Sequence, residues 1–220
     1  MGGIFATWFL NLQSQEWKDR YIDSFIALST PWGGSTDTLQ AVTSGYTFGI
    51  SFISPLVVRP EQRTIETNYL MLPNARVWSA NKHFVLSDER SYTASRTDMN
   101  DMFRRIGVST ERYNYVRDAN EQNGASGVMP PNPGVLTYCI YGDGLDTSDV
   151  LDFRGGNFPD SKPRIQTVSG DGTVSYESLS ACREWNLGDR EIKLQSASHS
   201  GVLQDDKGIQ EILKILLRNK

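Results

Sequence analysis

The first residues of the chain follow the period of an α-helix. Gly2 and Gly3, which allow close backbone packing, precede a set of apolar residues. The set recurs at helical spacing and consists of Ile4, Phe5, Trp8, Phe9 and Leu12. The segment has no Lys or Arg before Lys18, and Ala6 stands where an N-myristoylation signal needs Ser or Thr. It therefore predicts an amphipathic helix inside a domain and no signal peptide.

Four short apolar runs predict β-strands. They span residues 21–28, 134–141, 164–168 and 191–194. Loops rich in glycine and small polar residues follow them, such as W-G-G-S after the first run and G-D-G-T after the third. Strands that alternate with helices and end in such loops are typical of an α/β sheet, which is the fold class that we expect.

Two further helices are expected from periodicity. Residues 95–107 carry a stripe whose ordinary role is core packing, formed by Met99, Met102, Phe103 and Ile106. The last helix has basic residues near its end, which suits the helix dipole. Its apolar positions are Ile209, Ile212, Leu213, Leu216 and Leu217.

The pattern weakens between residues 35 and 81. Residues 49–58 are apolar but are interrupted by Pro55, and charged residues follow. An irregular insertion of this kind fits either a lid or binding loop or an ordinary peripheral subdomain. Residues 120–133 are rich in Gly, Asn and Pro and predict a loop.

Composition narrows the class of protein. Of the 220 residues, 38% are hydrophobic and 22% are charged, which supports a folded core. The net charge of −4 argues against nucleic-acid binding, which needs a basic excess. No apolar run reaches the about 18 residues of a transmembrane helix. The chain has no dinucleotide or Walker loop, EF-hand series or C-x-x-C pair, so no cofactor or metal is indicated.

Histidine is scarce and focuses the search for chemistry. We interpret His83 as structural or exposed, whereas His199 lies in a loop of small residues between a predicted strand and the last helix. Asp171, in G-D-G-T-V, is either an Asp-Gly turn or an acid that orients His199. The order acid before histidine is that of α/β-hydrolases. Asp143, also after a strand, is the competing acid.

The two cysteines and the nucleophile leave alternatives open. Cys139 and Cys182 are either buried thiols of a cytosolic protein or a disulfide formed in an oxidising compartment. No G-x-S-x-G motif occurs, and Ser35 and Ser44 lack the strand–turn–helix setting of a nucleophile elbow. The chain begins M-G-G before a helix, as the last part of an elbow does, so we expect the serine just before Met1.

Motifs along the whole chain resemble one family in order. They are W-K-D-R-Y-I at 17–22, P-W-G-G-S at 31–35, E-Q-R-T at 61–64, Y-T at 92–93, P-G-V at 133–135, Y-C-I-Y-G at 138–142, F-P-D at 158–160, G-D-G-T-V at 170–174 and C-x-x-W at 182–185. The chain resembles the C-terminal portion of the lecithin:cholesterol acyltransferase family, which includes lysosomal phospholipase A2. P-W-G-G-S and G-D-G-T-V together are specific.

The resemblance implies a partial α/β-hydrolase domain over residues 1–220 without the N-terminal strands and the serine. About 35–133 would form a lid or cap insertion, and 134–220 the strands, the catalytic loops and the last helix. Residues 36–68 would be the lid over the acyl groove. The same resemblance implies that Asp171 and His199 are the catalytic acid and base and that Met1 is part of the oxyanion hole. It also implies that Trp32, Arg63 and Thr64 belong to the lid or substrate groove. Cys139 and Cys182 would form a disulfide.

The family's activity implies transfer of a phospholipid acyl chain to serine and then to an alcohol or water. The expected partners are a phospholipid or other lipid substrate and the periphery of a membrane or lipoprotein surface, with a secreted or lysosomal location. No cofactor, metal or nucleic acid is expected.

Three hypotheses follow from these expectations. The chain is a fragment of an acyltransferase or phospholipase that is inactive alone, a non-catalytic lipid-binding remnant, or a different lipase that uses Ser35. Without early strands the sheet would have an open edge and half a core, so we also expect the isolated chain to be marginally stable.

Overall fold

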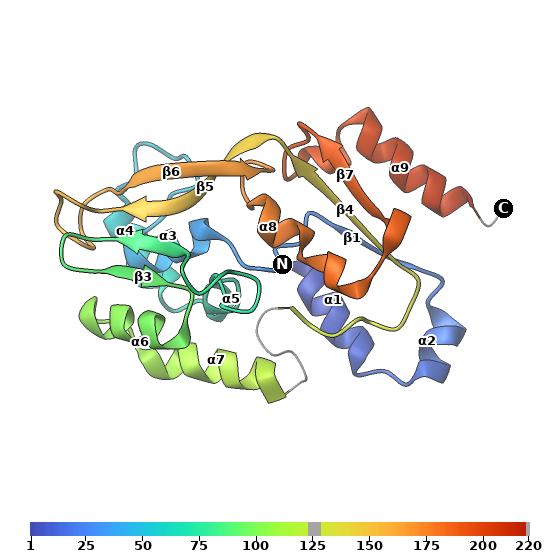
Figure 1. Ribbon diagram of the computed structural model, residues 1–220, viewed down its shortest axis with the longest axis horizontal. Coiled ribbons are helices and arrows are strands. Elements are labelled where there is room, and N and C mark those ends of the chain that lie inside the picture. The colour runs from blue at the N-terminus through green and yellow to red at the C-terminus, as the bar shows by residue number, and fades with distance from the viewer. Residues whose placement is uncertain (123–128, 219–220) are drawn as a thin grey trace. The chain divides into compact units, whose positions relative to one another are not determined.

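The computed structural model describes residues 1–122 and 129–218, and these form two compact units. Unit 1 comprises Met1–Trp32, Met129–Thr147 and Val168–Lys220, and unit 2 comprises Gly33–Val128 and Ser148–Thr167. Figure 1 labels the elements of both. Helices and parallel and mixed sheets make this a mixed α/β protein. Among the described residues, no helix is both long enough and apolar enough to cross a membrane.

Unit 1 is built around a three-stranded parallel sheet with the order β1-β4-β7. The strands are β1 (Phe25–Leu28), β4 (Thr137–Asp143) and β7 (Glu191–Gln195). The register pairs Phe25 with Thr137 and Cys139 with Glu191. The carboxyl ends of the strands therefore meet at one edge, where α/β proteins usually place their sites.

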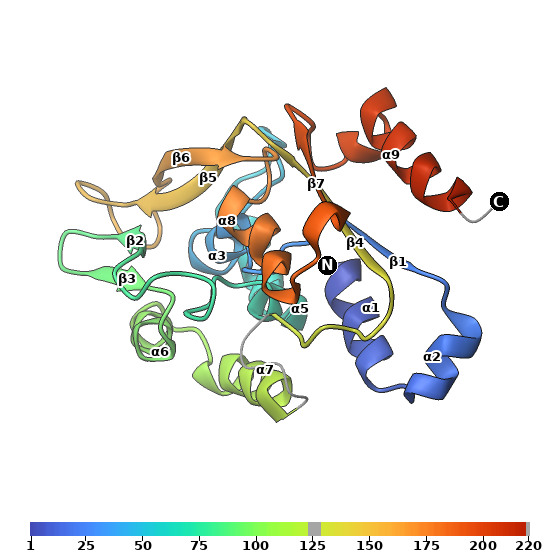
Figure 2. The same cartoon turned by 45° about the vertical axis from the view of Figure 1, so that its right-hand side comes forward.

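Short helices and turns complete unit 1. They are α1 (Gly2–Asn11), α2 (Gln15–Tyr21), α8 (Tyr176–Leu179), the 3-10 turns η1 (Ser180–Trp185), η2 (Gly188–Arg190) and η3 (Gly201–Leu203), and α9 (Asp206–Leu217). Figures 1 and 2 show α1 and α9 on opposite sides of the parallel sheet.

Alternation along β4 sends its side chains to the two faces of that sheet. Tyr138 and Ile140 belong to a buried cluster with Ile215 of α9. On the other face, Cys139 is bonded to Cys182 of η1, and the Tyr141 ring contacts Tyr176 of α8. All seven residues of β4 are buried, which explains its almost continuous apolar sequence.

Unit 2 combines helices with a small mixed sheet of order β3-β2-β5-β6. Its helices are α3 (Thr36–Thr43), α4 (Pro55–Gln62), α5 (Glu66–Leu70), α6 (Arg96–Arg105) and α7 (Thr110–Gln122). The strands are β2 (His83–Leu86) and β3 (Ser91–Thr93), with β5 (Leu145–Asp152) and β6 (Arg164–Gly170) each continuing into unit 1.

Several local predictions are confirmed, and two are corrected. Helix α6 buries Met99, Met102 and Phe103 as predicted. The irregular segment after residue 35 instead contains three helices, because Ser35 caps α3 and Pro55 occupies the first turn of α4, where proline is favoured. Of the predicted loop 120–133, residues 120–122 end α7, and 123–128 lie outside the described residues.

The predicted inward face of α1 was also partly wrong. The helix buries Ile4, Thr7 and Leu10, whereas Phe5 and Phe9 are exposed. The Thr7 hydroxyl donates to the Gly3 carbonyl within the helix, which allows this polar residue to face inward. Helical spacing predicted the helix but not which side of it would be buried.

Candidate active site

Asp171 and His199 lie next to each other in unit 1. Asp171 directly follows β6, and His199 lies in the loop between β7 and η3. The imidazole Nδ1 is 2.7 Å from Asp171 Oδ2, and the His199 backbone N–H donates to the Asp171 carbonyl at 2.9 Å. Two hydrogen bonds therefore join two loops that are far apart in sequence.

The turn after β6 fixes the orientation of the Asp171 carboxylate. Its Oδ1 accepts hydrogen bonds from the backbone N–H groups of Thr173 (3.1 Å) and Val174 (2.8 Å). Gly172 has φ +86°, a conformation that favours glycine, and its N–H donates to Thr147 Oγ1. The carboxylate is buried, and its second oxygen is directed at the imidazole. Asp171 therefore both forms an Asp-Gly turn and contacts His199, so the two alternatives for this residue are compatible.

The His199 ring is hydrogen-bonded through one nitrogen and partly exposed. A carboxylate can only accept, so Nδ1 is assigned as the donor and Nε2 is left as the basic nitrogen. The side chain is 35% exposed, whereas the Asp171 side chain is 0% exposed. The imidazole is therefore accessible to solvent, whereas the carboxylate that contacts it is shielded from water.

Gly142 makes room for these loops at the end of β4. A Cβ atom there would lie 1.9 Å from the Ala197 carbonyl oxygen and 3.2 Å from Asp171 Cβ. The backbone of the histidine loop is also strained at Ser196, the residue before Ala197, which has φ +61°. Close backbone approach is therefore what holds the histidine loop against the acid turn.

Sequence reasoning missed Ser29, the residue that follows β1. It has φ +44°, and its buried Oγ has no hydrogen-bond partner among the described residues. Strained residues with orphaned polar atoms are frequent at functional sites. The only signal in the sequence was a small polar residue at the end of an apolar strand.

Asp143, the competing acid, has other partners. Its carboxylate accepts from Ser169 Oγ at 2.6 Å and pairs with Lys193 at 3.3 Å. Burial alone would raise the pKa of Asp143, but hydrogen bonds from Ser169 and the Gly144 N–H, together with the Lys193 ammonium, outweigh it and lower that pKa. The histidine contact therefore belongs to Asp171 and not to Asp143.

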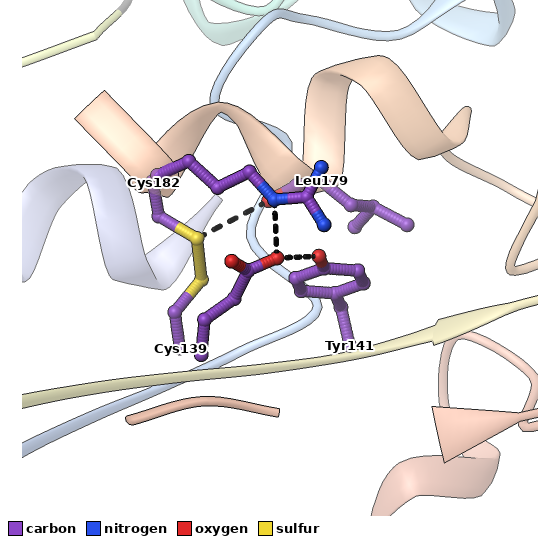
Figure 3. The surroundings of a disulfide bond; sticks show 6 residues. Cys139, Tyr141, Leu179 and Cys182 are labelled. Atoms are coloured by element: carbon purple, nitrogen blue, oxygen red, sulfur yellow. Dashed lines mark hydrogen bonds and ion pairs between the residues drawn. A yellow bond between two sulfur atoms is a disulfide. The ribbon is translucent and has the colours of Figure 1, made fainter. Parts of the chain in front are cut away.

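The two cysteines form a disulfide, which excludes the alternative of two free thiols. In Figure 3 the disulfide and the Tyr141 ring project from β4 toward the segment that carries Leu179 and Cys182. The Glu191 carboxylate accepts hydrogen bonds from the Tyr141 hydroxyl and from Arg183. Burial, followed by the contact with Glu191, raises the pKa of Tyr141 and keeps the phenol neutral.

The other predicted site residues lie in varied surroundings. Met1 caps α1 and is half exposed, and burial lowers the pKa of its α-amino group. Trp32 is fully buried, with its ring edge-on to Trp185 at 4.8 Å. In unit 2, Arg63 donates to the carbonyls of the α3 carboxyl end, and Thr64 is exposed and donates to the Glu61 carbonyl.

The other serines and the other histidine considered as candidates lie at the ends of helices and strands in unit 2. Ser35 Oγ accepts from the Asp37 backbone N–H as the N-cap of α3. Ser44 is buried at the C-cap of the same helix. His83 is exposed at the start of β2, as predicted. Among the described residues, no group of three or more His, Cys, Asp or Glu side chains could hold a metal ion.

Parallel strands, with a hydrogen-bonded aspartate–histidine pair in the loops that follow β6 and β7, define the class as a mixed α/β protein. The family model for lecithin:cholesterol acyltransferase matches residues 1–116 and 107–217. The chain belongs to this family.

Curated relatives agree with this assignment. The chain is 36% identical to lecithin-cholesterol acyltransferase-like 1 of Arabidopsis thaliana, over 97% of this chain and 48% of that protein. It is 35% identical to lysosomal phospholipase A and acyltransferase of Mus musculus, over 99% and 52%. It is 31% identical to phosphatidylcholine-sterol acyltransferase of Oryctolagus cuniculus, over 99% and 49%. The chain therefore spans about half the length of the curated relatives it matches.

Proposed function

We propose that Asp171 and His199 are the acid and base of a serine-dependent acyl transfer from a phospholipid to an alcohol or water. The observation that carries the proposal is the 2.7 Å contact between His199 Nδ1 and Asp171 Oδ2. Relatives named as phospholipases and acyltransferases support the lipid ester as substrate. The proposed fold is that of an α/β-hydrolase, with residues 36–68 as its lid and the rest of 35–133 as the cap.

The chemistry follows from the free nitrogen of the imidazole. His199 Nε2 takes the proton of a serine hydroxyl, and the serine oxygen attacks the ester carbonyl. Asp171 stabilises the resulting imidazolium through Nδ1–H, and backbone N–H groups stabilise the oxyanion, with Met1 as the proposed donor. His199 then gives its proton to the departing lysolipid oxygen. Water or an alcohol, deprotonated by His199, cleaves the acyl-serine ester and restores the serine.

Peripheral contact with a membrane or lipoprotein and a secreted or lysosomal location belong to the same proposal. The disulfide between Cys139 and Cys182 supports an oxidising compartment. In this proposal Trp32, Arg63 and Thr64 belong to the lid and the acyl groove. Arg63 also holds α3 in place through hydrogen bonds to the carbonyls at its carboxyl end.

The test uses the protein expressed from its complete transcript, assayed for cleavage of phosphatidylcholine in vesicles. Asp171→Asn is expected to lower kcat about 10⁴-fold, because the tautomer of His199 is no longer fixed. Asp143→Asn, which alters the neighbouring acid, is the matched control and should change kcat by less than about tenfold. Equal losses in the two variants, or activity that survives His199→Ala, would contradict the proposal.

A fluorophosphonate probe identifies the nucleophile independently of the lipid. The probe should label one serine, and His199→Ala should abolish the label because the hydroxyl is no longer activated. Peptide mapping that places the label on Ser35 would instead support the hypothesis of a different lipase.

A lipid-binding protein without turnover is the second candidate. Exposed apolar residues such as Phe48 and Phe52 favour it. Vesicle binding combined with no fluorophosphonate labelling and no ester cleavage would establish this alternative.

A further inference from the structure

An uncharged segment of unit 2 exposes its largest apolar side chains. Residues 46–58 read Y-T-F-G-I-S-F-I-S-P-L-V-V and contain no Asp, Glu, Lys or Arg. Phe52 is 87% exposed, Phe48 is 77% exposed and Val57 is 72% exposed. Ile50 and Leu56 are each more than two-fifths exposed. We call residues 46–58 the apolar loop, although its last four residues form the first turn of α4.

The base of the apolar loop is fixed by two partly buried hydrogen bonds to Gln62. Gln62 Oε1 accepts from the Tyr46 backbone N–H at 3.0 Å, and Gln62 Nε2 donates to the Tyr46 carbonyl at 2.6 Å. Gly45, with φ +87°, packs so closely that a Cβ atom would lie 2.1 Å from the Pro55 carbonyl oxygen. Because its base is tied in this way, the loop presents its apolar tip as a formed surface.

Phe48 occupies an unfavourable backbone conformation at that tip. Its φ is +52°, in the left-handed region that bulky residues rarely adopt. The ring contacts Tyr46 edge-on at 4.9 Å but remains mostly exposed, so burial within unit 2 does not offset the strain. Residues in strained backbone conformations cluster at ligand-binding and other functional sites.

Charge decides which kind of surface suits the loop. The nearest cation along the chain, Arg59, is paired with Asp160 at 2.7 Å, and the whole chain has net charge −4. The loop itself therefore offers no charge to an acidic membrane or to another polyanion. A projecting loop of aromatic and aliphatic groups instead matches the interface of a neutral bilayer, where such side chains enter the headgroup and acyl boundary.

We propose that the apolar loop inserts Phe48 and Phe52 into a zwitterionic phospholipid surface and so anchors the protein on it. The choice of lipid rests on the proposed function, but the anchoring does not require turnover. The loop acts by burial of apolar area, so its binding is expected to be insensitive to salt.

Flotation of the chain with phosphatidylcholine vesicles tests this inference, since flotation separates bound protein from aggregates. The double variant Phe48→Ser/Phe52→Ser is expected to lower the partition coefficient about tenfold or more for each ring removed. Tyr115→Ser removes from α7 a ring that is 67% exposed and should leave binding unchanged. Equal losses in both variants, or no loss in either, would overturn the proposal.

Two further measurements keep the test decisive if a variant folds poorly. Binding of the parent chain in about 0.1 M and 0.5 M NaCl should agree within about twofold, whereas an electrostatic mode would weaken strongly. Phe52→Trp should add a fluorescence component that shifts to the blue with vesicles. No shift would overturn the proposal. Loss of self-association instead of vesicle binding in the double variant would also overturn it, by showing that another molecule of this protein covers the loop.

The two proposals can fail separately. The flotation assay is repeated in the His199→Ala background, where no ester is cleaved. Vesicle binding that needs the two rings, with no serine labelled in the protein that retains His199, keeps the anchor and rejects the acyl-transfer function. Ester cleavage with vesicle binding unaffected by Phe48→Ser/Phe52→Ser keeps the function and rejects the anchor.

Discussion

At the scale of single residues, two aspartates at the ends of strands make different contacts. Asp171 uses one oxygen for its own turn and the other for His199. Asp152, at the end of β5, accepts from Arg154 Nε and Nη2 at 2.9 Å and from Arg164 at 3.1 Å. The hydrogen bonds from Arg154 hold the pKa of Asp152 far below its ordinary value. The first carboxylate is available to the candidate site, and the second is committed to stability.

Asp152 should make stability depend on pH in the acid range. Its pKa is lower in the folded than in the unfolded chain, so its contribution is complete above the ordinary carboxyl pKa of about 4 and is lost as pH falls through the folded value. The difference in unfolding free energy between the parent and Asp152→Asn should therefore be largest near pH 7 and shrink below about pH 4. Urea denaturation across this range measures it.

Asp146→Asn is the matched control because Asp146 is an exposed residue of the same strand. The difference in unfolding free energy between Asp146→Asn and the parent should be small and nearly constant with pH. A constant difference for Asp152→Asn as well would refute the assigned role of the Arg154 contact.

At the scale of elements, local chemistry sets where helices begin. Ser14, Ser35 and Ser95 each accept a backbone N–H at the start of α2, α3 and α6. Such caps are readable from sequence because donor and acceptor are two or three residues apart. The strand β4 is different, because its glycine, Gly142, leaves space for the backbone of Ala197, more than fifty residues further along the chain.

Gly142→Ala should displace the histidine loop. The added Cβ would lie 1.9 Å from the Ala197 carbonyl, so either β4 or the loop must shift. We expect unfolding free energy to fall by about 1–3 kcal/mol, as in other overpacked sites, and fluorophosphonate labelling to slow. Denaturant unfolding and the labelling rate measure the two effects.

Gly2→Ala serves as the control for stability, because a Cβ there has nothing within 4 Å. This variant should be neutral or slightly more stable, since alanine favours the helix. Parent-like stability in Gly142→Ala would mean that the loop does not pack as described.

At the scale of the whole molecule, one covalent link ties the parallel sheet to the segment after β6. The disulfide joins β4 to η1 across 43 residues. Both cysteines are buried, and the Tyr141–Glu191–Arg183 contacts lie beside them (Figure 3). The link closes a loop of the unfolded chain that contains the whole segment from the end of β4 to the acid turn after β6.

Removal of that link should cost about 4 kcal/mol of unfolding free energy in the chain-entropy treatment. The variant Cys139→Ala/Cys182→Ala is expected to unfold at a lower guanidinium concentration than the oxidised parent. Reduction of the parent should move its transition in the same direction, whereas the variant should not respond to reductant. An unchanged midpoint in the variant would contradict the prediction.

The sequence by itself determined the α/β class, the family resemblance, the helix around Met99 and Met102, and the short set of residues that includes Asp171 and His199. These features depend on local periodicity, capping and motif order. The pairing of His199 with Asp171 instead of Asp143, the disulfide and the buried side of α1 were decided only by tertiary structure. Each of these requires contact between residues far apart in the chain, and local propensity does not specify which distant partners meet.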